Sequence, residues 1–445
     1  MSDNATKSAE DWVPVALPVP THWSYVGFEE AFDPISTNGI KTPEAQYAAS
    51  GRFPIVDQGK EFIGGYTDNE DNVVNQDGTV IVFGDHTRCF KLISFPFAPG
   101  ADGTKILRSA PYLAPKFAYY GCLSLKLPDR GYSRHYSFLK KSKFPVAPIE
   151  EQHRIVARIE ELFSEVDSGV ESLVIAREHL SAYRQSVLNK AVAGELAGSR
   201  NFPRKPLSAV VEEMGQGWSP RCLNHPSADD DIWAVITTTA IQHGAFYDQE
   251  NKQLPQELEP RPHLSIQAGD ILITRAGPRK RVGVACLVRR CRPRIMLCDK
   301  AYRLRADTTQ IVPEWLELVL NSPSVLQQIE ELKTGINDSG VNLTQNRFLA
   351  LEIPVPKLAA QKAILSVVDR LTSRVRNLEA QIETAMKQSA VLRQSILKRA
   401  FSGQLVSQDS ADEPASILLE RVSAKRSGND AIRRRKNKNS KMEAA

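Results

Sequence analysis

The chain has 445 residues, of which 42% are hydrophobic and 24% are charged, and its formal net charge is +5. This length predicts roughly two to four domains with hydrophobic cores of ordinary size. No apolar run approaches the ~18 residues of a membrane-spanning helix, and the first residues lack the basic and apolar regions of a secretory signal. The six cysteines form no CxxC pair, which favours reduced thiols in a cytoplasmic protein over a metal site.

Residues 1–144 are predicted to form a first globular α+β domain. Short apolar runs such as VIVFG at 80–84 alternate with turns, a pattern typical of strands. The segments GDHTR at 84–88 and GYSRHYSFLKK at 131–141 place cations beside aromatic residues, and such side chains suit phosphates and guanine edges. The candidate DNA-binding residues of this domain are Arg88, Lys91, Arg134, His135 and Lys140.

A long helix is predicted within a helical spacer at 145–198. Ile159, Val166, Leu173, Leu180 and Val187 recur at every seventh position, and a second set that includes Leu162 fills the other seam position. This heptad pattern is typical of a coiled coil. Prolines stand just before the helix, and a glycine marks its exit.

Residues 199–353 are predicted to form a second α+β domain. Between positions 277 and 305 the sequence carries ten lysines and arginines against one acidic residue, a charge of +9 in 29 residues. Such a stretch indicates either a surface for phosphate backbones or a solvated pair of strands without a partner. From it and the residues just before it we take Arg275, Arg279, Lys280 and Arg281 as candidate DNA contacts.

A polar loop, GINDSGVNLTQNRF, follows at 335–348. Asparagine and glutamine read adenine with two hydrogen bonds, so Asn342, Gln345 and Arg347 are further candidate DNA contacts. An ordinary helix end followed by a turn would explain the same composition equally well.

The spacer helix occurs twice. When the sequence is shifted by 209 positions, residues 145–196 align with 354–405 without a gap, and 15 of the 52 positions are identical. The second spacer is predicted at 354–407. The predicted seam between the two helices consists of Ile159, Leu162, Val166, Leu173, Leu180, Val368, Leu371, Val375, Ile382 and Leu392.

Two matching helices in one chain can pair with each other. Antiparallel pairing would relate the two globular domains by a pseudo-twofold axis, and parallel pairing would set the domains side by side. A third arrangement, in which each helix packs only on its own domain, leaves the sustained heptads unexplained. The predicted fold class is therefore α+β, with two globular domains separated by an antiparallel intramolecular coiled coil.

Residues 408–445 are predicted to form a tail. Ser410 or Asp412 would cap a short helix with Pro414 in its first turn, and the basic end RRRKNKNSKMEAA is expected to be disordered.

Sequence motifs for catalysis are absent. There is no GxxxxGK[ST] loop for nucleotide phosphates, no Rossmann fingerprint, and no GxSxG or HExxH motif. Asp85 and His86 form a pair without a nucleophile or a third group, which does not predict a catalytic site. Nuclease carboxylates follow no fixed spacing, so a nuclease stays open at this point.

Taken together, these segments resemble the specificity subunits of type I restriction–modification systems over essentially the whole chain. The resemblance lies in the helix entries FPVAPIEEQHRIVARIEELFSEVD and IPVPKLAAQKAILSVVDRL and in the exits RQSVLNKAVAGEL and RQSILKRAFSGQL. GDHTR, GYSRHY and GDILITRAG in the globular domains match as well. The second entry departs from the family pattern at Ala360, where an acidic residue usually precedes the glutamine.

The resemblance implies a function in recognition and assembly. Each globular segment would be a target-recognition domain that reads one half of a split DNA sequence, and the helices would set the spacer and dock two methyltransferase subunits. ATP-driven restriction subunits would join that core. The chain itself would be non-catalytic and would hold no metal or cofactor, whereas S-adenosylmethionine, ATP and Mg²⁺ would act in the partner subunits.

Three alternatives remain from the residues alone. The chain could be a stand-alone bipartite DNA-binding protein or repressor, a nuclease with unrecognised carboxylates, or a coiled-coil scaffold that binds only proteins. The +9 stretch argues against the scaffold.

Overall fold

The computed structural model describes residues 17–424, except for positions 38, 75, 130, 132, 199–201 and 336. The predicted basic end of the tail lies outside these residues. The chain divides into two compact units. Unit 1 comprises Met1–Ser172 and Ala385–Ala445, and unit 2 comprises Leu173–Thr384. Each unit therefore contains one globular domain and one half of each long helix, a division that cuts across the predicted segments.

The globular domain of unit 1 has three layers. Its four-stranded sheet has the order β2-β8-β5-β6, its three-stranded sheet has the order β4-β3-β7, and a ladder pairs β1 with β9. The strands are β1 (Ser24–Gly27), β2 (Phe32–Ile35), β3 (Phe53–Val56), β4 (Gly65–Thr67), β5 (Val80–Gly84), β6 (Phe90–Ile93), β7 (Ala98–Pro99), β8 (Thr104–Ser109) and β9 (Lys143–Val146). The helices are α1 (Phe28–Ala31), α2 (Pro115–Ser124) and α3 (Tyr136–Lys141).

The central strand β5 is buried on both faces, which explains its uninterrupted apolar sequence. Ile81 and Phe83 belong to the core beneath α2. Val80 and Val82 point to the opposite face and pack in a smaller core with Val56 of β3. Because neighbouring residues of a strand face opposite sides, this one strand joins the helical layer to the second sheet.

The globular domain of unit 2 repeats this strand order. Its four-stranded sheet is β11-β20-β16-β18, its three-stranded sheet is β15-β12-β19, and β10 pairs with β23. The strands are β10 (Arg204–Pro206), β11 (Val211–Gln216), β12 (Ala234–Ile236), β15 (Asn251–Gln253), β16 (Ile271–Thr274), β18 (Ala285–Leu287), β19 (Ile295–Met296), β20 (Ala301–Ala306) and β23 (Glu352–Pro354).

The shorter elements of unit 2 are β13 (Ile241–Gln242), β14 (Ala245–Phe246), β17 (Ala276–Gly277), β21 (Lys333–Thr334), β22 (Val341–Leu343), α5 (Pro313–Leu320), α6 (Pro323–Leu332) and α7 (Gln345–Leu349). In both domains one outer strand of the three-stranded sheet is parallel to the central one, β7 to β3 and β19 to β12. The internal repeat therefore extends from the helices to the globular domains, although these share little sequence.

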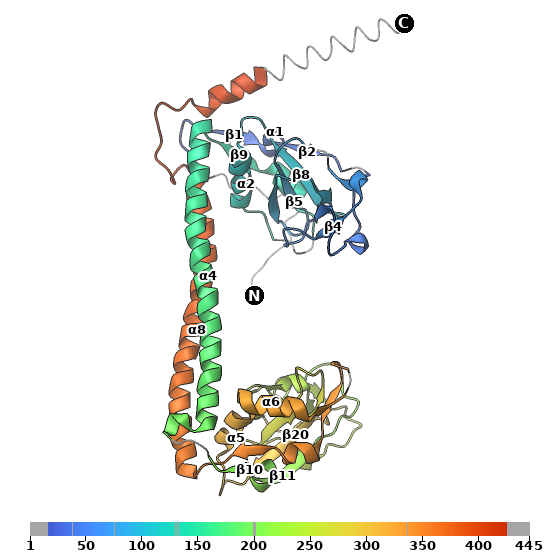
Figure 1. Ribbon diagram of the computed structural model, residues 1–445. Coiled ribbons are helices and arrows are strands. Elements are labelled where there is room, and N and C mark those ends of the chain that lie inside the picture. Colours follow the sequence, from blue (N-terminus) through green and yellow to red (C-terminus); the bar gives the residue numbers. More distant parts are fainter. Residues whose placement is uncertain are drawn as a thin grey trace. The chain divides into compact units, whose positions relative to one another are not determined.

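The two long helices are α4 (Ile149–Ala193) and α8 (Leu358–Ala400). In unit 1 the start of α4, with Ile155 and Ile159, shares a core with the end of α8, with Ile396 and Leu397. In unit 2 the end of α4, with Val187 and Val192, shares a core with the start of α8, with Ile364 and Val368. The helices therefore pack together in antiparallel fashion (Figure 1). This confirms the predicted mixed fold with an antiparallel helix pair.

A buried glutamine fixes the start of α4 on the first domain. Gln152 is fully buried, and its Oε1 accepts the backbone N–H of Ala114, the N-cap residue of α2, at 2.8 Å. Its Nε2 donates to the carbonyls of Tyr112 and Ala147, both at 2.9 Å. One side chain thus joins the long helix to the start of α2 and to the segment that leads into α4.

Gln361 repeats this arrangement at the start of α8. Its Oε1 accepts the N–H of Val312, the N-cap residue of α5, at 2.8 Å. Its Nε2 donates to the carbonyls of Gln310 at 2.9 Å and Pro356 at 2.7 Å. The recurring glutamine of the helix entry is therefore a structural anchor.

The helix exits also match. Gly194 and Gly403 follow the two long helices with φ values of 88° and 68°, a left-handed conformation in which glycine avoids the steric cost of a side chain. Ala191 and Ala400, three residues before each glycine, are fully buried.

The tail packs on the first unit. Residues 415–424 are helical, and Leu418 and Leu419 pack against the core of unit 1. The carboxylate of Asp412 receives hydrogen bonds from both terminal nitrogens of Arg154, at 2.6 and 3.3 Å. Asp412 therefore ties the tail to α4 through its side chain.

We expect Gln361→Ala to destabilise unit 2 by about 2–4 kcal/mol, because a buried N–H and two carbonyls lose their partner. Urea unfolding followed by tryptophan fluorescence measures the effect, since Trp315 lies in the core of that unit. Gln381→Ala, at an exposed position of α8, is the control and should change stability by less than ~0.5 kcal/mol. Equal unfolding midpoints for the two variants would contradict the anchor.

The tail contact should depend on pH. The hydrogen bonds from Arg154 are the main reason why the pKa of Asp412 lies below its ordinary 3.8. A carboxyl group with a lowered pKa stabilises the fold above its unfolded pKa, and this contribution is lost as the pH falls through the folded pKa. We expect Asp412→Asn to speed hydrogen exchange in 415–424 at pH 7, and the difference from the unaltered chain to shrink only as the pH falls below the ordinary pKa of 3.8.

Candidate nucleic-acid interface

The end of β5 organises the polar surface of the first domain. The carboxylate of Asp85 is buried and accepts the backbone N–H groups of His135 at 2.8 Å and Tyr136 at 2.7 Å. These bonds tie the start of α3 to the β5 hairpin and leave the neighbouring Arg134 exposed. Asp85 is therefore a structural residue that positions the loop.

Two of the five candidate DNA contacts in this domain are buried. His135 is fully buried, and its Nδ1 lies 3.0 Å from the carbonyl oxygen of Asp85. Lys91 is 5% exposed, and its ammonium donates to the carbonyl of Asp57 at 2.9 Å. Neither side chain reaches the surface in this structure, so the structure contradicts a direct DNA contact for either residue.

The other three candidates lie nearer the surface. The guanidinium of Arg88 pairs with Asp129 at 3.0 Å, and the ammonium of Lys140 pairs with Glu29 at 2.5 Å. Arg134 is exposed. These ion pairs are accessible to water and are worth little in stability, so both cations can exchange their partner for a phosphate.

The basic stretch of the second domain is largely neutralised by carboxylates from other parts of the fold. Six of its ten cations form ion pairs with acidic residues outside the stretch: Arg279 with Glu330 and Asp338, Arg289 with Glu317, Arg292 with Asp230, Arg294 with Asp231, Arg303 with Glu213, and Arg305 with Glu213 and Asp270. Among the described residues, Lys280, Arg290 and Lys300 are exposed and carry no ion pair. Most of the charge of this stretch is therefore used in ion pairs within the domain, and its contact with phosphate backbones stays a prediction that rests on the remaining exposed cations.

Two predicted contacts, one in this stretch and one just before it, form hydrogen bonds within the domain. The guanidinium of Arg281 donates to the carbonyls of Thr238 at 2.6 Å and Ile241 at 2.7 Å. The Nε of Arg275 donates to the carbonyl of Asp299 at 2.7 Å. The guanidinium of Arg281 and the Nε of Arg275 therefore bind backbone oxygens within the domain, and a DNA contact by either residue stays a prediction.

The predicted polar loop contains regular structure. Asn342 is exposed on β22, which pairs with β17 and with β21. Gln345 and Arg347 are exposed on the short helix α7. A helix end followed by a turn therefore does not fully describe this segment. The three side chains are exposed and can contact a partner.

The predicted seam residues fall into three groups. Ile159, Val368, Val375 and Ile382 are buried. The residues that are partly buried are Leu162, Val166, Leu173, Leu180 and Leu371. Leu392 is 50% exposed, so its assignment to the seam is contradicted. The adjacent Arg393 faces α4 instead, with its guanidinium 4.7 Å from the ring of Phe163 and paired with Asp167.

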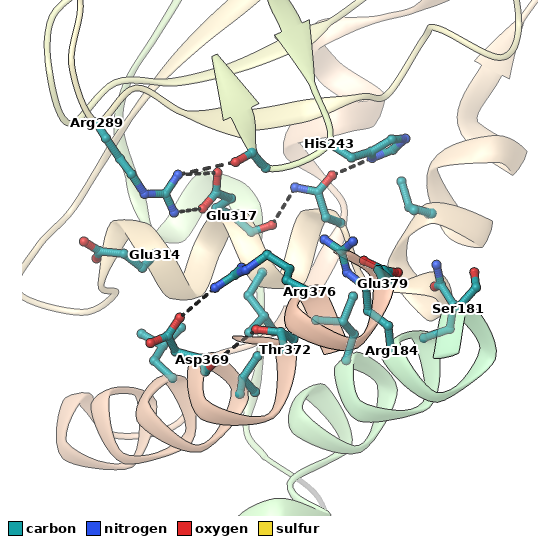
Figure 2. Close-up of a pocket in the computed structure, with 18 residues that line it drawn as sticks. Ser181, Arg184, His243, Arg289, Glu314, Glu317, Asp369, Thr372, Arg376 and Glu379 are labelled. Carbon is teal, nitrogen blue, oxygen red and sulfur yellow. Dashed lines mark hydrogen bonds and ion pairs between the residues drawn. The ribbon is translucent and has the colours of Figure 1, made fainter. Parts of the chain in front are cut away.

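A cavity of about 570 Å³ lies in unit 2 between α4, α5 and α8 (Figure 2). Its lining includes Arg184, the counterpart of Arg393 in the first repeat. The shift of 209 positions places Thr372 and Arg376 where the other unit has Phe163 and Asp167. Arg184 therefore lacks counterparts of Phe163 and Asp167, and its cavity is lined by the carboxylates of Asp369 and Glu379 among other residues.

A second hollow, of about 430 Å³, is lined by Arg221, Lys252 and Lys300. Arg221 and Lys252 were not predicted from the sequence, because each is a single cation in its local segment, and Lys300 was predicted only as one member of the basic stretch. Only the folding of β12, β15 and two loops brings the three cations together.

The described residues hold no candidate metal site. They contain no group of three or more histidine, cysteine or acidic side chains that could hold a metal ion. All six cysteines are free, and burial raises the pKa of the Cys286 thiol to about 12. Within the described part of the chain, no helix is long and apolar enough to span a membrane.

Known structures include this fold. A chain from a structure of complex assembly and conformational transition in a type I R-M system aligns with a TM-score of 0.62 and 18% identity, over 87% of this chain and 99% of that one. The protein therefore shares the fold of a component of such a system. No family model matches the chain.

Sequence comparison finds relatives with a named role. The EcoEI specificity subunit of Escherichia coli is 33% identical over 44% of this chain and 33% of its own length. The EcoKI specificity subunit of Escherichia coli strain K12 is 28% identical over 63% of both chains. The matched parts thus span between one third and about two thirds of these relatives. This protein is a relative of the type I restriction enzyme specificity subunits.

We expect Arg281→Ala to lower the stability of unit 2 by about 2–3 kcal/mol, because two carbonyl oxygens lose a charged donor. Lys280→Ala, at the exposed neighbouring position, is the matched control and should leave the unfolding midpoint unchanged. Thermal unfolding measures both variants. Equal stability of the two variants would contradict a stabilising role for the hydrogen bonds of Arg281.

Proposed function

We propose that the chain is the DNA-specificity subunit of a type I restriction–modification complex and has no catalytic site of its own. The observation that carries this proposal is its relation to named specificity subunits, which for the EcoKI subunit extends over 63% of the chain. Each globular domain is a target-recognition domain for one half of a bipartite DNA sequence.

The repeated topology supports a split target. Two domains with one strand order but different surface residues are suited to reading two different half-sites in the same way. In the first domain the predicted contacts Arg88, Arg134 and Lys140 lie at or near the surface. In the second domain Lys280, Asn342, Gln345 and Arg347 are exposed. Phosphate contacts supply affinity, and contacts to base edges supply sequence choice.

The paired helices support a spacing and docking role. A helix of 45 residues is about 68 Å long, which exceeds the ~34 Å of one turn of DNA between neighbouring half-sites. In this proposal the helices dock two methyltransferase subunits, and restriction subunits join that assembly. S-adenosylmethionine, ATP and Mg²⁺ act in those partners, and the assembly works on DNA in the cytoplasm.

The methylation pattern of cells that carry the intact system tests this function. We expect a bipartite methylated sequence with a fixed spacer. Deleting one heptad from the middle of each helix, residues 170–176 and 382–388, should shorten the spacer by about 3 base pairs, because seven residues span ~10.5 Å and a base pair ~3.4 Å.

The same variant provides the control, since both half-sites should remain unchanged. A spacer that keeps its original length in an active variant would contradict the role of the helices. A methylation pattern that does not depend on this chain would contradict the proposed function itself.

A further inference from the structure

The hollow of about 430 Å³ beside β12 has a wall with more cations than carboxylates. Three exposed cations line it, namely Arg221, Lys252 and Lys300, against one carboxylate, Asp299. That carboxylate is occupied by the hydroxyl group of Ser219. Among the described residues none of the three cations has an ion pair, in contrast to most arginines of the basic stretch.

The walls of this hollow are fixed by hydrogen bonds. The loop that carries Arg221 is held at one end by the N–H of Trp218, which donates to the carbonyl of Leu297 at 3.0 Å. It is held at the other end by the N–H of Leu223, which donates to the carbonyl of Gln253 at 3.0 Å. The loop therefore presents Arg221 opposite the end of the three-stranded sheet.

A close backbone approach keeps this loop in place. A Cβ atom on Gly217 would lie 2.1 Å from the carbonyl oxygen of Leu297 and 2.5 Å from that of Cys298. These distances are far shorter than any van der Waals contact, so only glycine allows the loop to pass over the sheet there. The hollow is thus built into the fold.

Arg275 and Arg281, whose guanidinium groups bind backbone carbonyls, also support the hollow. Arg275 binds the carbonyl of Asp299 and thereby holds the turn that carries Lys300. Arg281 binds the carbonyl of Thr238, which lines the hollow. The charge of these two residues is used to position the cationic wall.

The corresponding place in the first domain is occupied by an acidic and an aromatic side chain. Asp57 follows β3 as Thr237 follows β12. Beside Asp57, the phenol of Tyr47 approaches Gly100 closely enough to exclude a Cβ atom there, at 2.4 Å. The first domain therefore has a carboxylate and a tyrosine where the second has an open hollow.

We infer that Arg221, Lys252 and Lys300 form a binding site for the phosphate backbone of nucleic acid. This inference deepens the proposed function and rests on it, since the ligand is the DNA that the second domain reads. An anionic chain with regularly spaced charges matches three unpaired cations around an open hollow. Because phosphates carry no sequence information, the site positions DNA and does not select bases.

The triple variant Arg221→Gln, Lys252→Gln, Lys300→Gln in the full chain tests the site by titration with duplex DNA at several salt concentrations. Each lost phosphate contact lowers the salt slope of the binding constant by about 0.9, so we expect a decrease of about 2.7. Binding should weaken for target and unrelated duplexes alike. The control variant Lys190→Gln, Lys357→Gln, Lys362→Gln changes the same charge at other exposed positions of unit 2, and its slope should stay near that of the unaltered chain.

A second measurement needs no variant. Duplex DNA should protect Lys252 and Lys300 of the unaltered chain from amine acylation, as read by mass spectrometry, whereas Lys362 should stay reactive. If the unaltered chain binds DNA but the slope and the acylation are unchanged, the inferred site is wrong and the proposed function stands. If the unaltered chain shows no salt-dependent binding to DNA, the proposed function is contradicted, and the inferred site, which rests on it, is contradicted as well.

Discussion

The antiparallel pairing of α4 and α8 is the constraint on which the rest of the structure depends. Each unit receives the start of one long helix and the end of the other. The core of unit 1 contains Ile159 and Leu397, and the core of unit 2 contains Val187 and Val368. Neither domain can complete its core from its own contiguous segment, so the helix pair is a part of both domains and not a linker between them.

The anchoring glutamines determine where each helix leaves its domain. Gln152 and Gln361 each bind one N-cap amide and two carbonyls. A buried amide with all of these partners tolerates little movement, because an unpaired buried group costs about 1–3 kcal/mol. This rigidity suits a protein whose helices are proposed to set the separation of two DNA half-sites.

The sequence predicted the helices well because their determinants are local. The seven-residue period, the entry glutamine and the exit glycines are properties of short segments, and the repeat shows them twice. Leu392 fits the period, yet it is half exposed, because Arg393 takes the place facing α4 through the ring of Phe163 and the carboxylate of Asp167. A heptad pattern does not reveal that a neighbouring residue, and not the residue at the heptad position, makes the contact between the helices.

The surface charge could not be predicted in the same way. Arg303 pairs with Glu213, 90 positions away, and Arg281 binds carbonyls about 40 positions away. A count of charges along the chain treats these arginines as free, whereas the fold uses them to hold loops. The common strand order of the two domains was hidden as well, because a buried strand such as β5 or β16 requires only apolar residues and not particular ones.

The proposed function depends on two dissimilar surfaces carried by one repeated framework. In the first domain a buried aspartate orders the loop that exposes Arg134. In the second, internal arginines order the walls around Lys252 and Lys300. In the proposed function the framework holds the two domains, and their different surfaces would read the two half-sites.

Cysteine cross-linking tests the direction of the helix pair most directly. In an antiparallel pair position 167 lies beside position 393, where the ion pair joins Asp167 to Arg393. In a parallel pair with the register of the repeat, position 167 would instead lie beside position 376. Mild oxidation should therefore join the chain internally in the double variant Asp167→Cys, Arg393→Cys and not in Asp167→Cys, Arg376→Cys, as read by peptide mapping. The reverse result would contradict the antiparallel pair and the account built on it.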